Sequence, residues 1–179
     1  MGPIEEMEKL FVYIDGQSRG DPGEAAIGIA ITDKDGNVIE EISSLAGRST
    51  SNVASYRALI DACRHAEAYS PKSVIFFTHD LSLANQMNSV FDTREPHLKH
   101  LGEIAKGLLN RFPDWRVNLI DRSANRRAPH LVQAAFHDRV QTQMTRERQE
   151  LRLLASSTAL TPEQMEKLIE YAEQLKSEG

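Results

Sequence analysis

The spacing of apolar residues changes period near residue 50, and this change limits the folds that the chain can adopt. Three strand-like runs come before it, at residues 10–14, 24–32 and 38–45. An Asp-Gly pair between the second and third runs tolerates a positive φ, so it predicts a hairpin within an antiparallel unit. After the change, residues 51–68 follow helical spacing. The apolar positions of that helix are Val53, Tyr56, Leu59, Ile60, Cys63 and Ala66.

The rest of this pattern alternates helices with strands. Residues 73–78 form a fully apolar run typical of a central strand, and residues 115–121 alternate like a half-buried one. Helical spacing covers residues 81–90 and 96–112, and a last helix begins near Pro129. The order βββαβααβα predicts an α/β fold, with a mixed five-stranded sheet and helices on both faces.

Residues 137–179 are predicted to form a C-terminal helical extension beyond a domain of residues 7–136. A Ser-Ser-Thr break at 156–158 precedes a Thr-Pro-Glu-Gln segment at 161–164, which has the N-cap, proline and glutamine of a helix start. The helix that follows carries an apolar stripe of Met165, Leu168, Ile169, Ala172 and Leu175. Such a stripe must be buried somewhere. It could pack on its own domain, on a second copy in a homodimer, or on another protein partner.

Composition and charge exclude several classes of protein. The chain has 21 Lys and Arg against 26 Asp and Glu, so any site for a polyanion must be local. The first eight residues do not resemble a secretory signal, and no apolar run is long enough to cross a bilayer. The single cysteine, Cys63, cannot form an internal disulfide and is expected to be a small buried side chain. These features favour a cytoplasmic protein without a membrane partner.

Two segments carry the chemistry of the chain. Asp15 ends the first predicted strand, and a glycine-rich turn through Gly23 follows it. The sequence Thr-Ser-Asn-Val-Ala-Ser-Tyr at residues 50–56 opens the first long helix. Together these segments resemble the ribonuclease H family, type 1, in the short form that lacks a basic protrusion. The resemblance implies a ribonuclease H-like fold. It also implies hydrolysis of the RNA strand of RNA–DNA hybrids by two divalent ions, held by about four carboxylates.

Only one of the acids that the resemblance implies is present. Asp15 matches the first acid, at the tip of the first strand. Ser55 stands where the family pattern Thr-Asn-Asn-x-Ala-Glu-Tyr has its glutamate, and His79 stands where an aspartate follows the fourth strand. Pro129 falls where the last acid belongs. One carboxylate cannot offset the mutual repulsion of two dications, so the resemblance predicts a degenerate, inactive site.

Two rearrangements would restore metal binding. Asp80 could replace His79 as a ligand if the strand end relaxes. Alternatively, Asp15, His79 and His130 could hold zinc or manganese, because histidine is a poor ligand for magnesium. The simpler interpretation is that both histidines are partly exposed loop residues. We therefore expect no cofactor, and Mg or Mn if the protein is active.

The resemblance also implies residues that contact nucleic acid. The glycine-rich turn and the helix start would contact RNA 2′-hydroxyls, an Asn-Gln pair would lie in the minor groove, and arginines at one edge would hold phosphates. These residues are Gly16, Ser18, Arg19, Gly20, Asn52, Asn85, Gln86, Arg126 and Arg127, with Arg122 nearby. In the alternative interpretation, the turn serves folding alone and the arginines pair with neighbouring acids.

Three functions are compatible with the sequence. The first is a catalytically inactive ribonuclease H-like protein that binds RNA or RNA–DNA hybrid. The second is an active metal-dependent ribonuclease H with rearranged ligands. The third is a non-catalytic assembly module whose C-terminal helices carry the interaction. The absent acids argue against the second, and the negative net charge of −5 argues mildly against the first.

Overall fold

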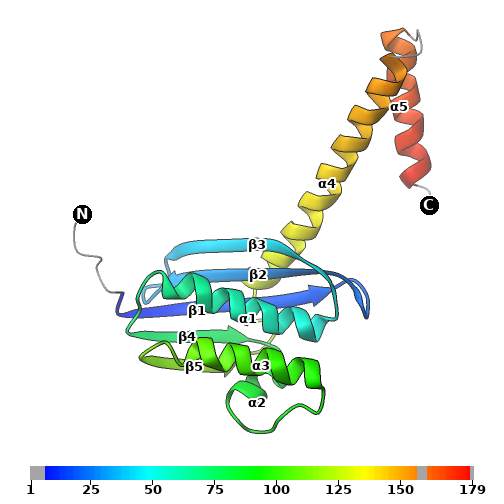
Figure 1. Cartoon of the computed structure of the whole chain (residues 1–179). Coiled ribbons are helices and arrows are strands. Elements are labelled where there is room, and N and C mark those ends of the chain that lie inside the picture. The colour runs from blue at the N-terminus through cyan, green and yellow to red at the C-terminus, as the bar shows by residue number, and fades with distance from the viewer. Residues whose placement is uncertain (1–6, 157–160, 178–179) are drawn as a thin grey trace. The chain divides into compact units, whose positions relative to one another are not determined.

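The computed structural model describes residues 7–156 and 161–177, which form five strands and five helices in the predicted order (Figure 1). The strands are β1 (Lys9–Ser18), β2 (Gly23–Asp33), β3 (Val38–Ser49), β4 (Ser73–Thr78) and β5 (Asp114–Leu119). The helices are α1 (Ser51–Glu67), α2 (Leu81–Met87), α3 (Pro96–Leu109), α4 (Arg127–Ser156) and α5 (Pro162–Ser177). None of the described helices is long and apolar enough to span a membrane.

The strands form one mixed sheet of order β3-β2-β1-β4-β5, which confirms the predicted α/β fold. β1 pairs antiparallel with β2, and β2 with β3, whereas β1, β4 and β5 run parallel. The predicted hairpin between β2 and β3 is confirmed. Gly36 has a φ of +83°, and Asp33 Oδ1 accepts hydrogen bonds from the backbone amides of Asp35 and Asn37 at 2.9 Å.

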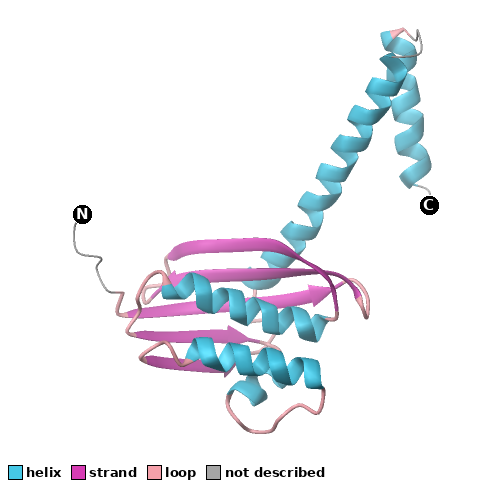
Figure 2. Cartoon of the chain, viewed as in Figure 1, coloured by secondary structure: helices cyan, strands magenta, loops and turns pink. Residues whose placement is uncertain are grey.

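Helices α1 and α3 cover one face of the sheet and enclose the main core (Figure 2). The alternating residues of β1 and β2 that point to this face are fully buried, as period 2 requires. They are Leu10, Val12 and Ile14 from β1, and Ile27, Ile29 and Ile31 from β2. β1 approaches α1 so closely at Gly16 that a Cβ there would lie 2.5 Å from the amide nitrogen of Ser55.

The start of α4 lies on the opposite face, over β2. A Cβ at Gly28 would lie 2.9 Å from Leu131 Cβ and 3.0 Å from Val132 N. A second small core of Ala26, Val132, Ala135 and Phe136 forms there. Helices therefore lie on both faces, as predicted, but α4 covers only the β2 side of its face. α4 begins at Arg127, two residues before the expected start, so Pro129 is its third residue.

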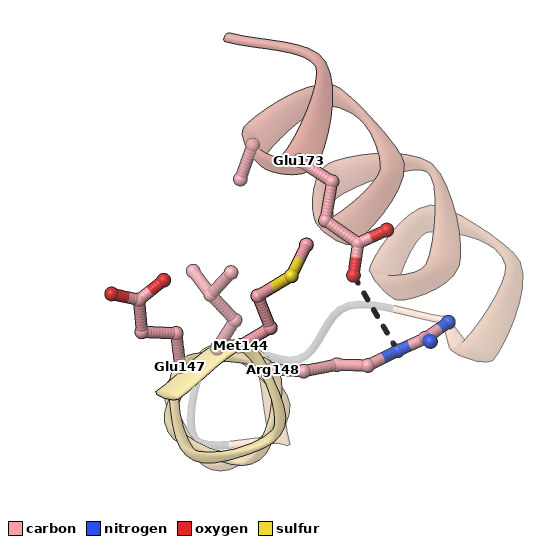
Figure 3. Close-up of a pocket in the computed structure, with 6 residues that line it drawn as sticks. Met144, Glu147, Arg148 and Glu173 are labelled. Atoms are coloured by element: carbon pink, nitrogen blue, oxygen red, sulfur yellow. Dashed lines mark ion pairs between the residues drawn. The ribbon is translucent and has the colours of Figure 1, made fainter. Parts of the chain in front are cut away.

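The chain divides into two compact units, residues 1–136 and 137–179. In the second unit, α5 packs on the later part of α4 through Ile169, which is fully buried. Arg148 pairs with Glu166 at 3.2 Å. It also pairs with Glu173 at 3.9 Å beside a small cavity (Figure 3). The predicted helix start is confirmed by reciprocal hydrogen bonds between Thr161 and Gln164. The side chain of Leu175 and residues 157–158 of the predicted break lie outside the described parts.

Cys63 provides a direct test of core packing. Its side chain is buried in α1, and burial raises the pKa of its thiol to about 12, with the charge of Glu67 acting in the same direction. At pH 8 the reactive thiolate is therefore almost absent. We expect no reaction with an aromatic disulfide reagent in the native protein, and rapid stoichiometric reaction in denaturant. The reaction is measured by absorbance, and rapid labelling of the native protein would contradict this packing.

Candidate functional site

Asp15 lies three residues before the end of β1, so the prediction that it ends the strand is wrong. The antiparallel pairing with β2 continues through Ser18, whereas the parallel pairing with β4 stops at Tyr13. Beyond Tyr13 the sheet is therefore open on the β4 side. His79, the first residue after β4, reaches this opening from the neighbouring strand.

The carboxylate of Asp15 is almost completely enclosed, with 4% of its side chain exposed. Gln17 Nε2 donates a hydrogen bond of 2.6 Å to Asp15 Oδ2, and His79 Nε2 lies 3.5 Å from Asp15 Oδ1. Burial raises the pKa of the Asp15 carboxyl above its ordinary value. The hydrogen bond from Gln17 and the nearby charges of His79 and Arg122 offset part of this increase.

Asn125 fixes the orientation of His79. Its Nδ2 donates to the carbonyl oxygen of Ile14 at 2.9 Å and lies 3.0 Å from His79 Nδ1. Because Nδ2 can only donate, Nδ1 of a neutral His79 accepts, and its proton resides on Nε2, facing Asp15. Asn125 is 1% exposed, and among the described residues its Oδ1 has no hydrogen-bond partner. The sequence places Asn125 in the segment matched to the family, but not next to β1.

Two glutamines complete this arrangement, and sequence reasoning did not single out either. Gln133 on α4 donates through Nε2 to Gln17 Oε1 at 3.1 Å, and Gln17 in turn donates to Asp15. Polar contacts thus run from α4 through Asp15 and His79 to Asn125. The alternation of β1 puts Gln17 on the same face as Asp15, and this was the available signal.

Ser55 and Pro129 supply no charge to the site. Ser55 is buried in α1, where its hydroxyl lies 3.5 Å from the carbonyl oxygen of Gly16. Pro129 is half-buried in the first turn of α4 and has no polar side chain. These two positions, at which the resemblance predicts further acids, therefore offer a weak hydroxyl contact and an aliphatic ring.

The two rearranged metal sites are not assembled. The carboxylate of Asp80 accepts a hydrogen bond from Leu83 N at 3.0 Å and caps α2. His130 is exposed on α4. Within residues 7–156 and 161–177, no three or more His, Cys, Asp or Glu side chains are grouped so that they could hold a metal ion. In this part of the chain, Asp15 and His79 face one another without a third such side chain grouped with them.

The glycine-rich turn is held largely by its own contacts. Ser18 Oγ lies 2.6 Å from the carbonyl oxygens of both Ser49 and Gly20, and Ser18 N donates to Ser51 Oγ at 3.0 Å. Asn52 and Arg19 are exposed beside this turn. The turn thus joins β1 to the start of α1 and leaves an amide and a guanidinium at the surface.

The other predicted contact residues separate into distinct places. Gln86 is buried, accepts a hydrogen bond from Tyr56 and donates to Asp92 at 3.3 Å, so in this conformation its amide supports the core. Asn85 is partly exposed. The arginines do not form one cluster. Arg19 stacks over the ring of Phe136 in α4. Phe136 lies nine residues after Arg127 in the same helix, so about 14 Å of helix separates the two positions.

This sheet order, with an acid on the central strand and residues of α1, β4 and α4 around it, defines a ribonuclease H-like protein. A family model described as "Reverse transcriptase-like" matches residues 13–135. The chain is 33% identical over 130 residues to ribonuclease HI of Halobacterium salinarum, covering 73% of this chain and 65% of the length of that relative. The chain belongs to the reverse transcriptase-like family and is homologous to RNase H1.

Solved structures agree with this relationship. RNase H1 from the halophilic archaeon Halobacterium salinarum NRC-1 matches with a TM-score of 0.71 and 33% identity, covering 73% of this chain and 98% of the other. LC11-RNase H1 in complex with RNA/DNA hybrid matches with a TM-score of 0.69 and 33% identity, covering 73% and 99%. The C-terminal extension lies outside the segment that the family model matches.

Proposed function

We propose that this protein binds RNA or RNA–DNA hybrid without cleaving it, as a non-catalytic member of its family. The observation that carries the proposal is the single, enclosed carboxylate of Asp15. The positions aligned with the other acids hold Ser55, His79 and Pro129. Asp15 itself is occupied by hydrogen bonding from Gln17 and faces His79.

Electrostatics supports the loss of two-metal catalysis. Two dications about 4 Å apart repel each other by about 17 kcal/mol at an effective dielectric constant of about 20. Several anionic ligands are needed to offset that repulsion, and the approaching phosphate adds only part of what is required. Asp15 alone, with its pKa raised by burial, is a weak substitute for such a set.

Retained surface features support binding. The turn that carries Gly16 and Gly20 keeps its connection to the start of α1, with Asn52 and Arg19 exposed beside it. A homologue, LC11-RNase H1, has been solved with RNA/DNA hybrid bound. Backbone and amide groups next to a cation suit recognition of 2′-hydroxyls and phosphates, and neither task needs the missing acids.

Purified full chain is expected to leave a labelled RNA–DNA hybrid intact with Mg²⁺ or Mn²⁺ present, and to bind it in preference to duplex DNA at low salt. Asn52→Ala combined with Arg19→Ala should weaken hybrid binding by about tenfold, because two surface contacts are removed. Lys167→Ala, which removes an exposed cation of α5, is the matched control and should bind as the wild type does.

Two results would contradict the proposal. Cleavage that disappears in Asp15→Asn would establish the alternative, a metal-dependent nuclease whose ligands assemble only with substrate. A complete absence of hybrid binding at low salt would favour the other alternative, an assembly module. For that function, the specific observation is the helical pair α4–α5, which leaves Leu168 and Tyr171 43% and 61% exposed.

A further inference from the structure

A row of aromatic rings lies on the sheet face opposite α1 and α3. Phe11 and Tyr13 of β1 alternate with the core residues Leu10, Val12 and Ile14, so they point away from the main core. Phe77 of β4 pairs with Tyr13 in the parallel register and points the same way. This aromatic row consists of Phe11, Phe77 and Tyr13.

The rings of the aromatic row stack on one another. The ring centroids of Phe11 and Phe77 are 5.9 Å apart, and those of Tyr13 and Phe77 are 4.9 Å apart, with interplanar angles of 26° and 19°. All three side chains remain partly exposed. On this face, the start of α4 packs over Ala26 and Gly28 of β2, so it leaves β1 and β4 uncovered at the row.

Cations surround the aromatic row. Lys9 Nζ lies 5.5 Å from the ring centroid of Phe11, and Arg116 of β5 is aligned with Phe11 through Ile75 of β4. Arg126 and Arg127 approach from the start of α4. Within the described sheet, the strand pairing places Asp114 and Glu41 on this face as well. These acids contact Ser73 and Arg127, respectively. Around the row, this face therefore carries four basic side chains and these two exposed acids, although the whole chain has a net charge of −5.

A cavity of about 270 Å³ adjoins Tyr13 at the end of the row. Tyr13, Thr32 and Gly36 line it from the sheet and the β2–β3 hairpin. Arg126, in the loop before α4, and Arg127, the first residue of α4, line it from the other side. The guanidinium of Arg126 is anchored by a hydrogen bond of 3.2 Å from Nε to Ser123 O. An aromatic ring with two guanidinium groups across a hollow suits a flat base beside its phosphate.

We infer that this face binds single-stranded nucleic acid, with a base stacked at the Tyr13 end of the aromatic row, beside the cavity, and phosphates at the surrounding cations. The rings require unpaired bases, because the bases of a duplex keep their faces stacked on each other. Charge complementarity selects a polyanion rather than an acidic or neutral protein surface. The site is separate from the proposed hybrid site, which lies at the glycine-rich turn beside α1.

The test is fluorescence anisotropy of the full chain with labelled twelve-nucleotide oligo(U) and oligo(dT) at low salt. The wild type should bind both, and Phe11→Leu combined with Tyr13→Leu should weaken binding by about tenfold or more, because stacking platforms are lost. Tyr171→Leu makes the same chemical change on the exposed face of α5 and should leave the affinity unchanged. Thermal unfolding confirms that each variant is folded.

A second double variant tests the contribution of the cations without changing any core residue. Lys9→Gln with Arg116→Gln should lower the slope of log affinity against log salt by about one to two units. The inference is overturned if the wild type binds neither oligonucleotide, or if the folded leucine variant binds them as tightly as the wild type does. It is also overturned if sedimentation shows that the face joins two copies of the chain, with a dimer that Tyr13→Leu abolishes.

Discussion

Introducing Ser55→Glu, His79→Asp and Pro129→Asp together is expected to create Mg²⁺-dependent cleavage of RNA–DNA hybrid, rising from no detectable activity to at least a hundredfold above background. The three changes supply the carboxylates that the resemblance to the ribonuclease H family implies at these positions, in addition to Asp15. Four carboxylates, together with the anionic phosphate of the substrate, can then offset the charge of two dications. Asp at position 129 also favours the first turn of α4, where the helix dipole is positive. Cleavage is followed on a labelled hybrid.

Thermal unfolding gives an independent measurement on the triple variant. Without metal, its crowded buried acids should lower the melting temperature. Mg²⁺ at about 100 times its dissociation constant should restore about 2.7 kcal/mol of stability, and the wild type should show no such gain. Adding Asp15→Asn to the triple variant should abolish cleavage. A folded triple variant that shows neither the Mg²⁺-dependent gain nor cleavage would show that these positions do not form one metal site.

Gly16→Ala is expected to destabilise the protein by about 3 kcal/mol or more. The added methyl would lie 2.5 Å from the amide nitrogen of Ser55 and closer still to the carbonyl group of Ala54. Backbone atoms cannot rotate away as side chains do, so β1 and α1 must separate. The free energy of unfolding, measured in urea, should fall, and hybrid binding should weaken because the turn after Gly16 moves with β1.

Gly107→Ala is the matched control for this substitution. Gly107 lies on the exposed side of α3, and a Cβ there would meet no atom within 4 Å. The same chemical change should therefore stabilise the protein by about 0.5–1 kcal/mol, the usual helix preference for Ala over Gly. Equal effects at positions 16 and 107 would contradict the close approach of β1 to α1.

The fold was largely predictable because its signals are local. The apolar run of β2, the Asp-Gly turn before Val38 and the Thr-Pro start of α5 each depend on a few adjacent residues. The predicted ends of the helices and strands were less accurate. β1 runs on to Ser18 because it continues to pair with β2, and α2 stops at Met87, before Ser89, which has a φ of +57°. Pairing partners and left-handed residues cannot be read from periodicity.

The candidate site was predictable at Asp15 and His79 but not in the contacts around them. Asn125 reaches Ile14 across 111 residues, and Gln133 reaches Gln17 across 116. No spacing rule connects positions so distant in sequence. The prediction that Arg19 lies at one edge with Arg126 and Arg127 was wrong for a related reason. The sequence does not show in which direction α4 leaves the loop at residue 126. The sequence shows which side chains are charged, but which residues lie next to them depends on the fold.

The polar contacts around Asp15 limit what a single added acid can do. Gln17 donates to one carboxylate oxygen, and His79 faces the other. A glutamate introduced at position 55 alone would enclose a second carboxylate near Gly16, and the two anions would repel each other without a dication between them. A lone acidic substitution at position 55 is therefore expected to cost stability, whereas a set of acids that binds metal together recovers it. Single substitutions are consequently tolerated better on other surfaces of the molecule than at this site.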